Sequence, residues 1–207
     1  LQEPGKGGRF FTAPGVFSAD GIDPGSAALA AALPKVLKGH VIDLGAGWGY
    51  LSDAILSRDG VLSVDLVEAD VVSLNAAKQN ITDARANFIW GDATSHTGTP
   101  ADHIVMNPPF HTDRTANPDL GRAFIRNAAK LLKPKGTLWL VANRHLPYET
   151  TLEESFHTVQ LLDQSASYKI YSATRPKPPR EGRATKSDYI AGKNAGVTGA
   201  RRGVGMW

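Results

Sequence analysis

The chain has 207 residues, of which 42% are hydrophobic and 21% are charged, and its formal net charge is +3. This composition is typical of one globular domain with a sizeable core. No apolar run is long enough for a membrane span, no signal-peptide pattern begins the sequence, and the absence of cysteine excludes disulfides and thiolate metal sites. The histidines have no metal-ligand spacing, so we expect no metal. The missing membrane span, signal peptide and cysteine together favour a cytoplasmic protein without a membrane partner.

The positive charge is concentrated at the carboxyl end. Residues 175–207 contain eight Lys and Arg against two Asp and Glu, a net charge of +6, which leaves −3 for the rest of the chain. This segment is rich in Gly and Pro and poor in large aliphatic residues, so we expect it to be irregular. Two interpretations stay open, a solvated terminus or an electrostatic arm that binds phosphates.

Apolar patterning predicts alternating helices and strands in the first half of the chain. We expect helices at 26–37, 50–57 and 71–80, and strands at 40–44, 62–67 and 87–90. Lys38 and Gly39 should end the first helix, and Val71, Leu74 and Ala77 should share one face of the third.

The second half continues this alternation and then changes. We expect strands at 103–106 and 137–142, helices at 120–132 and 152–156, and final strands at 158–162 and 168–173. A turn at 133–136 should follow the long helix. The connection between the last two strands is too short for a parallel crossover, so they should be antiparallel. The sequence therefore predicts an α/β fold, a doubly wound and mostly parallel seven-stranded sheet with a terminal antiparallel hairpin.

A glycine-rich loop follows the first strand directly, as Asp43-Leu-Gly45-Ala-Gly47-Trp-Gly49. Glycine lets the backbone approach a ligand and turn sharply into a helix whose N-terminus offers free N–H groups. The dinucleotide pattern G-x-G-x-x-G would need glycine in place of Tyr50, which disfavours a nicotinamide oxidoreductase.

Polar residues follow the ends of the next three strands. Glu68 lies 19 residues past Gly49, where a carboxylate can accept from two ribose hydroxyls, and Asp92 can accept from an adenine amino group. Asn107 begins Asn-Pro-Pro-Phe-His, in which the prolines end the strand and hold Asn107 extended. Ligands bind at the carboxyl ends of the strands in such a sheet, so these residues predict one site for an adenosine without a pyrophosphate.

These motifs resemble the class I S-adenosylmethionine-dependent methyltransferases. More narrowly, the segments P-G-V-F-S at 14–18, D-P-G-S at 23–26, N-P-P-F-H at 107–111 and V-A-N-R-H-L-P-Y at 141–148 resemble the ribosomal RNA small-subunit guanine-N2 methyltransferase C family and its large-subunit relative. The resemblance runs from about residue 11 to 175. It implies a Rossmann-like fold, S-adenosylmethionine as cofactor, no metal, and ribosomal RNA or a ribosomal subunit as partner.

The resemblance also implies which residues bind the cofactor. Two belong to the N-terminal loop and the others to the strand ends: Phe17, Ser18, Asp43, Gly45, Gly47, Gly49, Glu68, Asp92, Ala93 and Asn107. Trp48 would shield the site from water. The implied organisation is a loop segment over the cofactor at 1–25, the methyltransferase domain at 26–175 and a basic flexible tail at 176–207.

Catalysis would fall to Asn107, Pro108, Pro109 and Phe110. The Asn107 side-chain oxygen and the Pro108 carbonyl can accept from an amine, and the ring of Phe110 can stack on a flipped base.

Three further residues are candidates for substrate contact, each with a structural alternative. His111 could instead be a hydrogen-bonded loop histidine, Arg144 a surface ion pair, and Tyr148 a packed loop aromatic. The family's additional amino-terminal domain, which helps to read RNA, is not represented in this sequence, and the basic segment from Arg180 onward is not part of its pattern. No feature indicates an oligomeric state.

The sequence leaves more than one function open. Methylation of guanine N2 in ribosomal RNA is favoured by the flanking P-G-V-F-S and L-P-Y segments, whereas N-P-P-F alone also fits a protein glutamine or adenine N6 as acceptor. A non-catalytic RNA-binding module of the same fold is the third alternative. Intact Asp43, Glu68, Asp92 and Asn107 favour an active enzyme.

Overall fold

The computed structural model describes residues 10–109, 111–112, 115–116 and 118–178. Two of the sequence-predicted site residues, Phe110 and the side chain of His111, therefore lie outside the described part, as does the basic segment from residue 179 onward. No helix in the described ranges has the length and apolar character needed to cross a membrane.

Helices and strands alternate along the described chain. The helices are α1 (Pro24–Ala32), α2 (Tyr50–Leu56), α3 (Val71–Asn80), α4 (Pro118–Leu131) and α5 (Glu149–Ser155). The strands of the main sheet are β1 (Val36–Leu44), β2 (Asp59–Glu68), β3 (Ala86–Trp90), β4 (Ala101–Met106), β7 (Leu132–Asn143), β8 (Phe156–Gln164) and β9 (Tyr168–Pro176). Two short strands that the sequence did not predict, β5 (His111–Thr112) and β6 (Thr115–Ala116), form a separate antiparallel pair.

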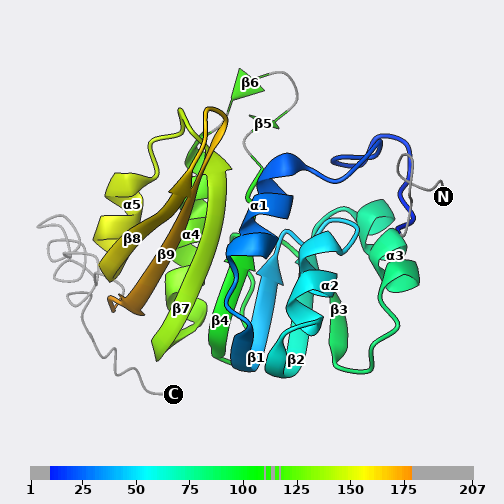
Figure 1. The fold of residues 1–207 in the computed structure, drawn as a ribbon, viewed down its shortest axis with the longest axis horizontal. Coiled ribbons are helices and arrows are strands. Elements are labelled where there is room, and N and C mark those ends of the chain that lie inside the picture. The colour runs from blue at the N-terminus through cyan, green and yellow to red at the C-terminus, as the bar shows by residue number, and fades with distance from the viewer. Residues whose placement is uncertain (1–9, 110, 113–114, 117, 179–207) are drawn as a thin grey trace, which may run out of the picture.

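The sheet has seven strands in the order β3-β2-β1-β4-β7-β9-β8. Its first five strands are parallel, and β9 is antiparallel to both β7 and β8. Helices α1, α2 and α3 cover one face and α4 and α5 cover the other (Figure 1). The predicted doubly wound sheet with a terminal hairpin is confirmed. Strand order reverses between β1 and β4, so a crevice is expected above their carboxyl ends.

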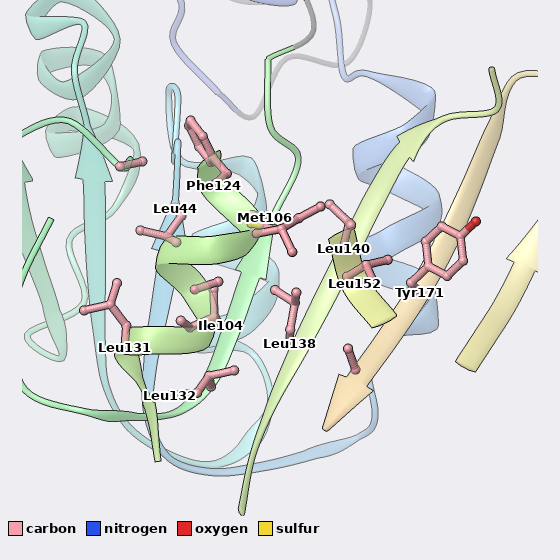
Figure 2. Close-up of a cluster of buried hydrophobic side chains, with 14 of the residues drawn as sticks. Leu44, Ile104, Met106, Phe124, Leu131, Leu132, Leu138, Leu140, Leu152 and Tyr171 are labelled. Atoms are coloured by element: carbon pink, nitrogen blue, oxygen red, sulfur yellow. The ribbon is translucent and has the colours of Figure 1, made fainter. Parts of the chain in front are cut away.

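The core divides along the two faces of the sheet. On the α4 side, Ile104 and Met106 of β4 and Leu138 and Leu140 of β7 are fully buried in one cluster that also includes Phe124 of α4 (Figure 2). Strand alternation sends the neighbouring Val105 and Val141 to the opposite face, where α1 and α2 pack. Burying each such side chain contributes about 1.5–3 kcal/mol to stability. The core therefore fixes the strand ends that carry the site.

The first helix differs most from its predicted bounds. It begins at Pro24 because the Asp23 carboxylate caps it by accepting from the Ser26 backbone N–H at 2.6 Å. It ends at Ala32 rather than residue 37, since Pro34 disfavours helical geometry at the residue before it. Gly39 was expected to end this helix but lies within β1, where its φ is +104°.

Two further expectations were wrong in detail. The bounds of α3 are those predicted, but Val71 is 46% exposed, because capping by Asp70 places it in the first turn and the helix buries Leu74 and Ala77 instead. The turn expected at 133–136 is an irregular start of β7, across which the pairing with β4 is shifted.

Gly121 generates a stability prediction. A Cβ at this buried position of α4 would lie 1.9 Å from Tyr148 Oη and 2.3 Å from Tyr148 Cζ. Alanine normally stabilises a helix interior by about 1 kcal/mol over glycine, but here overpacking should reverse the sign and cost about 1–3 kcal/mol. We expect Gly121→Ala to lower the free energy of unfolding in urea. Asn75→Ala, at an exposed position of α3, should not lower it, and equal stability of both variants would contradict the packing argument.

Candidate functional site

The glycine loop turns at the carboxyl end of β1. The backbone N–H groups of Gly45 and Ala46 both donate to the Val67 carbonyl, at 2.9 and 3.1 Å. Gly45 has φ +76°, and a Cβ there would lie 3.1 Å from a ring carbon of Phe124. At Gly47 the φ is +56° and the space beside the backbone is open, so the chain can approach a ligand here.

The Glu68 carboxylate is held by backbone donors from two loops. Its Oε2 accepts from Gly47 N and its Oε1 accepts from Asp70 N, each at 2.8 Å. A carboxylate oxygen can accept more than one hydrogen bond, so both oxygens retain capacity toward a ligand. The arrangement fits a carboxylate that is already oriented for a pair of hydroxyl groups.

Asp92 is oriented in a similar way after β3. Its Oδ1 accepts from the backbone N–H and the hydroxyl of Thr94, both at 2.8 Å. Both hydrogen bonds hold the pKa of Asp92 below its ordinary value, and the bond from the Thr94 backbone N–H has the larger effect. The group is therefore ionised at neutral pH. The adjacent Ala93 is buried, and its carbonyl accepts from Asn127 Nδ2 at 2.9 Å.

A cavity of about 500 Å³ joins these strand ends. Most of the sequence-predicted site residues line it: Phe17, Gly45, Gly47, Glu68, Asp92, Ala93, Asn107, Pro108 and Pro109. A smaller hollow of about 40 Å³ adjoins Gly45, Gly47 and Asn107 and is lined also by Ser18, Asp23 and Ser26. The cavity is lined by carboxylates and by apolar side chains, a combination of hydrogen-bond acceptors and apolar surface that fits an adenosine.

The N-terminal segment closes one side of this cavity as a strap, which we define as residues 10–22. Asn80 of α3 holds the strap at Phe11, accepting from its N–H at 2.6 Å and donating to its carbonyl at 2.8 Å. The indole of Trp48 donates to the Phe17 carbonyl at 2.9 Å. Trp48 is 4% exposed and packs against Phe10 at a centroid distance of 5.2 Å, so it anchors the strap over the glycine loop.

Asn107 directly follows β4 and lines the same cavity. Its Nδ2 donates to Asp23 Oδ2 at 3.0 Å and to Ser26 Oγ at 2.8 Å. The residue that follows, Pro108, is buried, whereas Pro109 is exposed at the cavity wall.

Asp43 lies beneath the glycine loop and is fully buried. Ser52 Oγ donates to its Oδ2 at 2.7 Å, while its Oδ1 has no partner among the described residues. Burial raises the pKa of Asp43 from its ordinary value of 3.8 to about 7, with Glu68 adding to the shift and the Ser52 hydrogen bond opposing it. A buried carboxylate oxygen without a donor fits a cationic or N–H-bearing ligand above it.

Besides the fully buried Asp43, three described residues that the sequence predicted line neither the cavity nor the smaller hollow. Gly49 is the N-cap of α2 with φ +96° and has a structural role. Arg144 is exposed, and its guanidinium donates to the Ser165 carbonyl at 3.4 Å; within the described ranges it does not form the alternative surface ion pair. Tyr148 is fully buried in the α4 side of the core, so its ring cannot form a wall for a base, and the alternative of a packed aromatic is the correct one.

Sequence reasoning missed several contributors to the site. Asp23 and Ser26 were noted only as part of a motif, although the capping pattern of Asp23 was visible. Phe124 was not predicted as a site residue, yet it is both buried in the core and part of the cavity wall, together with Leu120. Helix periodicity shows which face of α4 is buried but not that the end of this face reaches a ligand cavity.

Residues 7–172 match the model of the family described as methyltransferase small domain. Curated relatives named ribosomal RNA small subunit methyltransferase C are 32% identical in Hahella chejuensis, over 81% of this chain and 49% of that protein, and 38% identical in Alcanivorax borkumensis, over 77% and 50%. The chain thus spans about half the length of the curated relatives it matches.

Solved structures of methyltransferases are also similar to this chain. The T. thermophilus 16S rRNA N2 methyltransferase, in complex with AdoMet and guanosine, is 34% identical with a TM-score of 0.67, over 79% of this chain and 46% of that one. An S-adenosylmethionine-dependent O-methyltransferase from Thermotoga maritima is 15% identical with a TM-score of 0.59, over 77% and 68%, a likeness of fold alone.

The buried Asp43 generates a pH prediction. Between about pH 4 and pH 7 the folded state retains a proton that the unfolded state has released, so this carboxyl makes the ligand-free protein less stable as the pH rises through that window. Asp43→Asn should remove this part of the pH dependence, as measured by urea unfolding across the window. Asp163→Asn, at an exposed position of β8, is the control. Parallel stability curves for wild type and Asp43→Asn would contradict the shift.

Proposed function

Because the chain belongs to the methyltransferase small domain family, we propose that it is an S-adenosylmethionine-dependent methyltransferase that acts on the exocyclic N2 amine of guanine in ribosomal RNA. The observation that carries the proposal is the position of Asn107. It lines the same cavity as Glu68 and Asp92, so an amide is present where the two carboxylates would place the reactive end of an adenosine ligand. The names of the relatives support guanine in ribosomal RNA over glutamine or adenine as the acceptor.

The residues of the cavity fit the cofactor. Glu68 would accept from the two ribose hydroxyls and Asp92 from the adenine amino group. Gly45 and Gly47 leave room for the methionine moiety of the cofactor. The Oδ1 of Asp43, to which no residue in the described part of the chain donates, suits the amino end of that ligand. When bound, S-adenosylmethionine supplies an electrophilic methyl group on a sulfonium sulfur.

The chemistry left to the protein is the activation of a poor nucleophile. The lone pair of an exocyclic guanine amine is delocalised into the ring, so the amine must be held about 3 Å from the methyl group with its lone pair turned toward it. The Asn107 side-chain oxygen and the Pro108 carbonyl would both accept from the amine. Two acceptors favour the positive charge that develops on the nitrogen during attack, and no strong base is needed.

We also propose residues for substrate binding. We assign the stacking of a flipped base to Phe110 and contacts with RNA to His111 and Arg144. The net charge of +6 in residues 175–207 would add a salt-dependent attraction to RNA phosphates.

The test of the function is the distribution of label from S-adenosylmethionine. The protein is incubated separately with naked ribosomal RNA, assembled small subunits and total cell protein, and each is analysed for incorporated methyl groups. Label in RNA that is recovered as N2-methylguanosine supports the proposal. Label in glutamine or adenine, or no label in any sample, would refute it.

Glu68→Ala generates a binding prediction. It removes the acceptors for two hydroxyls, each worth about 1.5–3 kcal/mol for a charged partner. We expect the affinity for S-adenosylmethionine to fall at least tenfold in calorimetry, with circular dichroism showing a retained fold. Glu154→Ala, at an exposed position of α5, should bind as the wild type does. Unchanged affinity of Glu68→Ala would exclude the ribose role.

Asn107→Ala generates a rate prediction. It should leave cofactor affinity nearly unchanged and lower the single-turnover methylation rate by about a hundredfold, the order found on losing one preorganised polar contact. Asn107→Asp should also bind cofactor and react slowly, since its added charge stabilises the sulfonium ground state. Asn75→Ala is the control. If Asn107→Ala methylates at the wild-type rate, Asn107 has no role in the reaction and the Asn-Pro-Pro segment serves only to end the strand.

A further inference from the structure

The Asn107 side chain is held by the first turn of α1, more than eighty residues away in sequence. Its Nδ2 donates to Asp23 Oδ2 at 3.0 Å and to Ser26 Oγ at 2.8 Å. Ser26 is 7% exposed, so this contact is largely shielded from solvent. Neither partner belongs to the strand or loop that carries Asn107.

The chemistry of these partners determines which way the amide faces. A carboxylate carries no proton, so only the NH₂ end of the amide can face Asp23. The two hydrogens of Nδ2 are directed to Asp23 and Ser26, and the oxygen is then the polar atom of Asn107 that remains for the cavity. If the amide were flipped, its oxygen would face a carboxylate oxygen, which is repulsive.

Asp23 and Ser26, which hold the amide, are themselves fixed in place. The same Asp23 Oδ2 accepts from the Ser26 backbone N–H at 2.6 Å, which ties the contact to the N-cap of α1. At Gly25 an added Cβ would lie 3.1 Å from Asp23 Oδ2 and 3.4 Å from a methyl carbon of Val141, so the helix start packs closely against β7. The amide orientation is therefore set by the packing of α1 on the sheet.

We propose that Asp23 and Ser26 are positioning residues that present the Asn107 amide oxygen, and not its nitrogen, to the methyl acceptor. This inference rests on the proposed function and narrows its substrate class. An acceptor whose reactive nitrogen carries N–H groups, such as an exocyclic amine, can bond to that oxygen. A ring nitrogen that offers only a lone pair meets repulsion from it. The Asp23 carboxylate also polarises the amide and strengthens its oxygen as an acceptor.

Ser26→Ala tests the proposal with little risk to the fold. The N-cap uses the backbone N–H of Ser26, which the variant keeps, and alanine favours a helix. In the full chain we expect single-turnover methylation of ribosomal RNA to slow about tenfold, with cofactor affinity within about twofold of wild type. Ser26→Thr, which keeps the acceptor oxygen, should recover most of the rate. Ser57→Ala, which deletes an exposed hydroxyl that donates to the Ala54 carbonyl, is the matched control.

A double-mutant cycle separates positioning from general damage. If Ser26 acts only through Asn107, the double variant Ser26→Ala with Asn107→Ala should be no slower than Asn107→Ala alone. Rates that multiply would show that Ser26 acts independently of Asn107 and would overturn the proposal.

A measurement without RNA keeps this inference distinguishable from the proposed function. The side-chain NH₂ signals of Asn107, identified by their loss in Asn107→Ala, should exchange slowly with solvent in the wild type and at least tenfold faster in Ser26→Ala and Asp23→Ala. Slow exchange in all three proteins would overturn the positioning role. If the wild type fails to methylate RNA, the proposed function fails, and the exchange rates still decide whether Asp23 and Ser26 hold the amide.

Discussion

The parallel pairing of β1 with β2 on one side and β4 on the other determines where the site can be. Leu44 lies level with Val67 and also with Met106. The next residue along each strand therefore reaches the sheet edge at the same height, which brings together Gly45, Glu68 and Asn107. A shift of one residue in either pairing would turn a side chain to the opposite face of the sheet. The buried side chains of β1, β2 and β4 fix the register of these strands, and the register in turn determines where polar residues that are not part of the core are placed.

The buried Asp43 shows how the site departs from the rules that stabilise the rest of the protein. An apolar or amide side chain under the glycine loop would avoid the desolvation of a carboxyl group, yet a carboxyl stands there with one oxygen lacking a partner among the described residues. Such conflicts with local stability are expected where a ligand supplies the missing interaction. The surrounding β1 residues, Val41, Ile42 and Leu44, are fully buried and offset this cost.

Sequence patterns predicted the elements of the fold better than their ends. Alternation of apolar residues located all seven strands of the sheet, and the short link after Gln164 correctly predicted the antiparallel hairpin. The predicted end of α1 was wrong because apolar residues continue past Ala32, at Leu33, Val36 and Leu37, whereas Pro34 stops the helix.

Contacts between distant segments were beyond sequence reasoning. The sequence left Tyr148 open between a substrate contact and a packed loop aromatic, and only the glycine-sized space that α4 leaves at Gly121 decides for packing. The bond from Asn107 to Asp23 joins residues on elements whose adjacency depends on the whole sheet order. Residues that line the cavity because they follow a strand end, such as Glu68, could be predicted, whereas residues that support the site from another element could not.

The strap has a mechanical consequence. Residues 10–22 form a wall of the cavity and run directly into Asp23, so one short stretch of backbone connects Phe10 both to the cavity wall and to the carboxylate that accepts from Asn107. Its attachments through Asn80 and Trp48 are a few hydrogen bonds and one aromatic cluster. A displacement applied to the chain ahead of Phe10 would pull on the cavity wall and on the amide of Asn107 together, because the same covalent segment carries both.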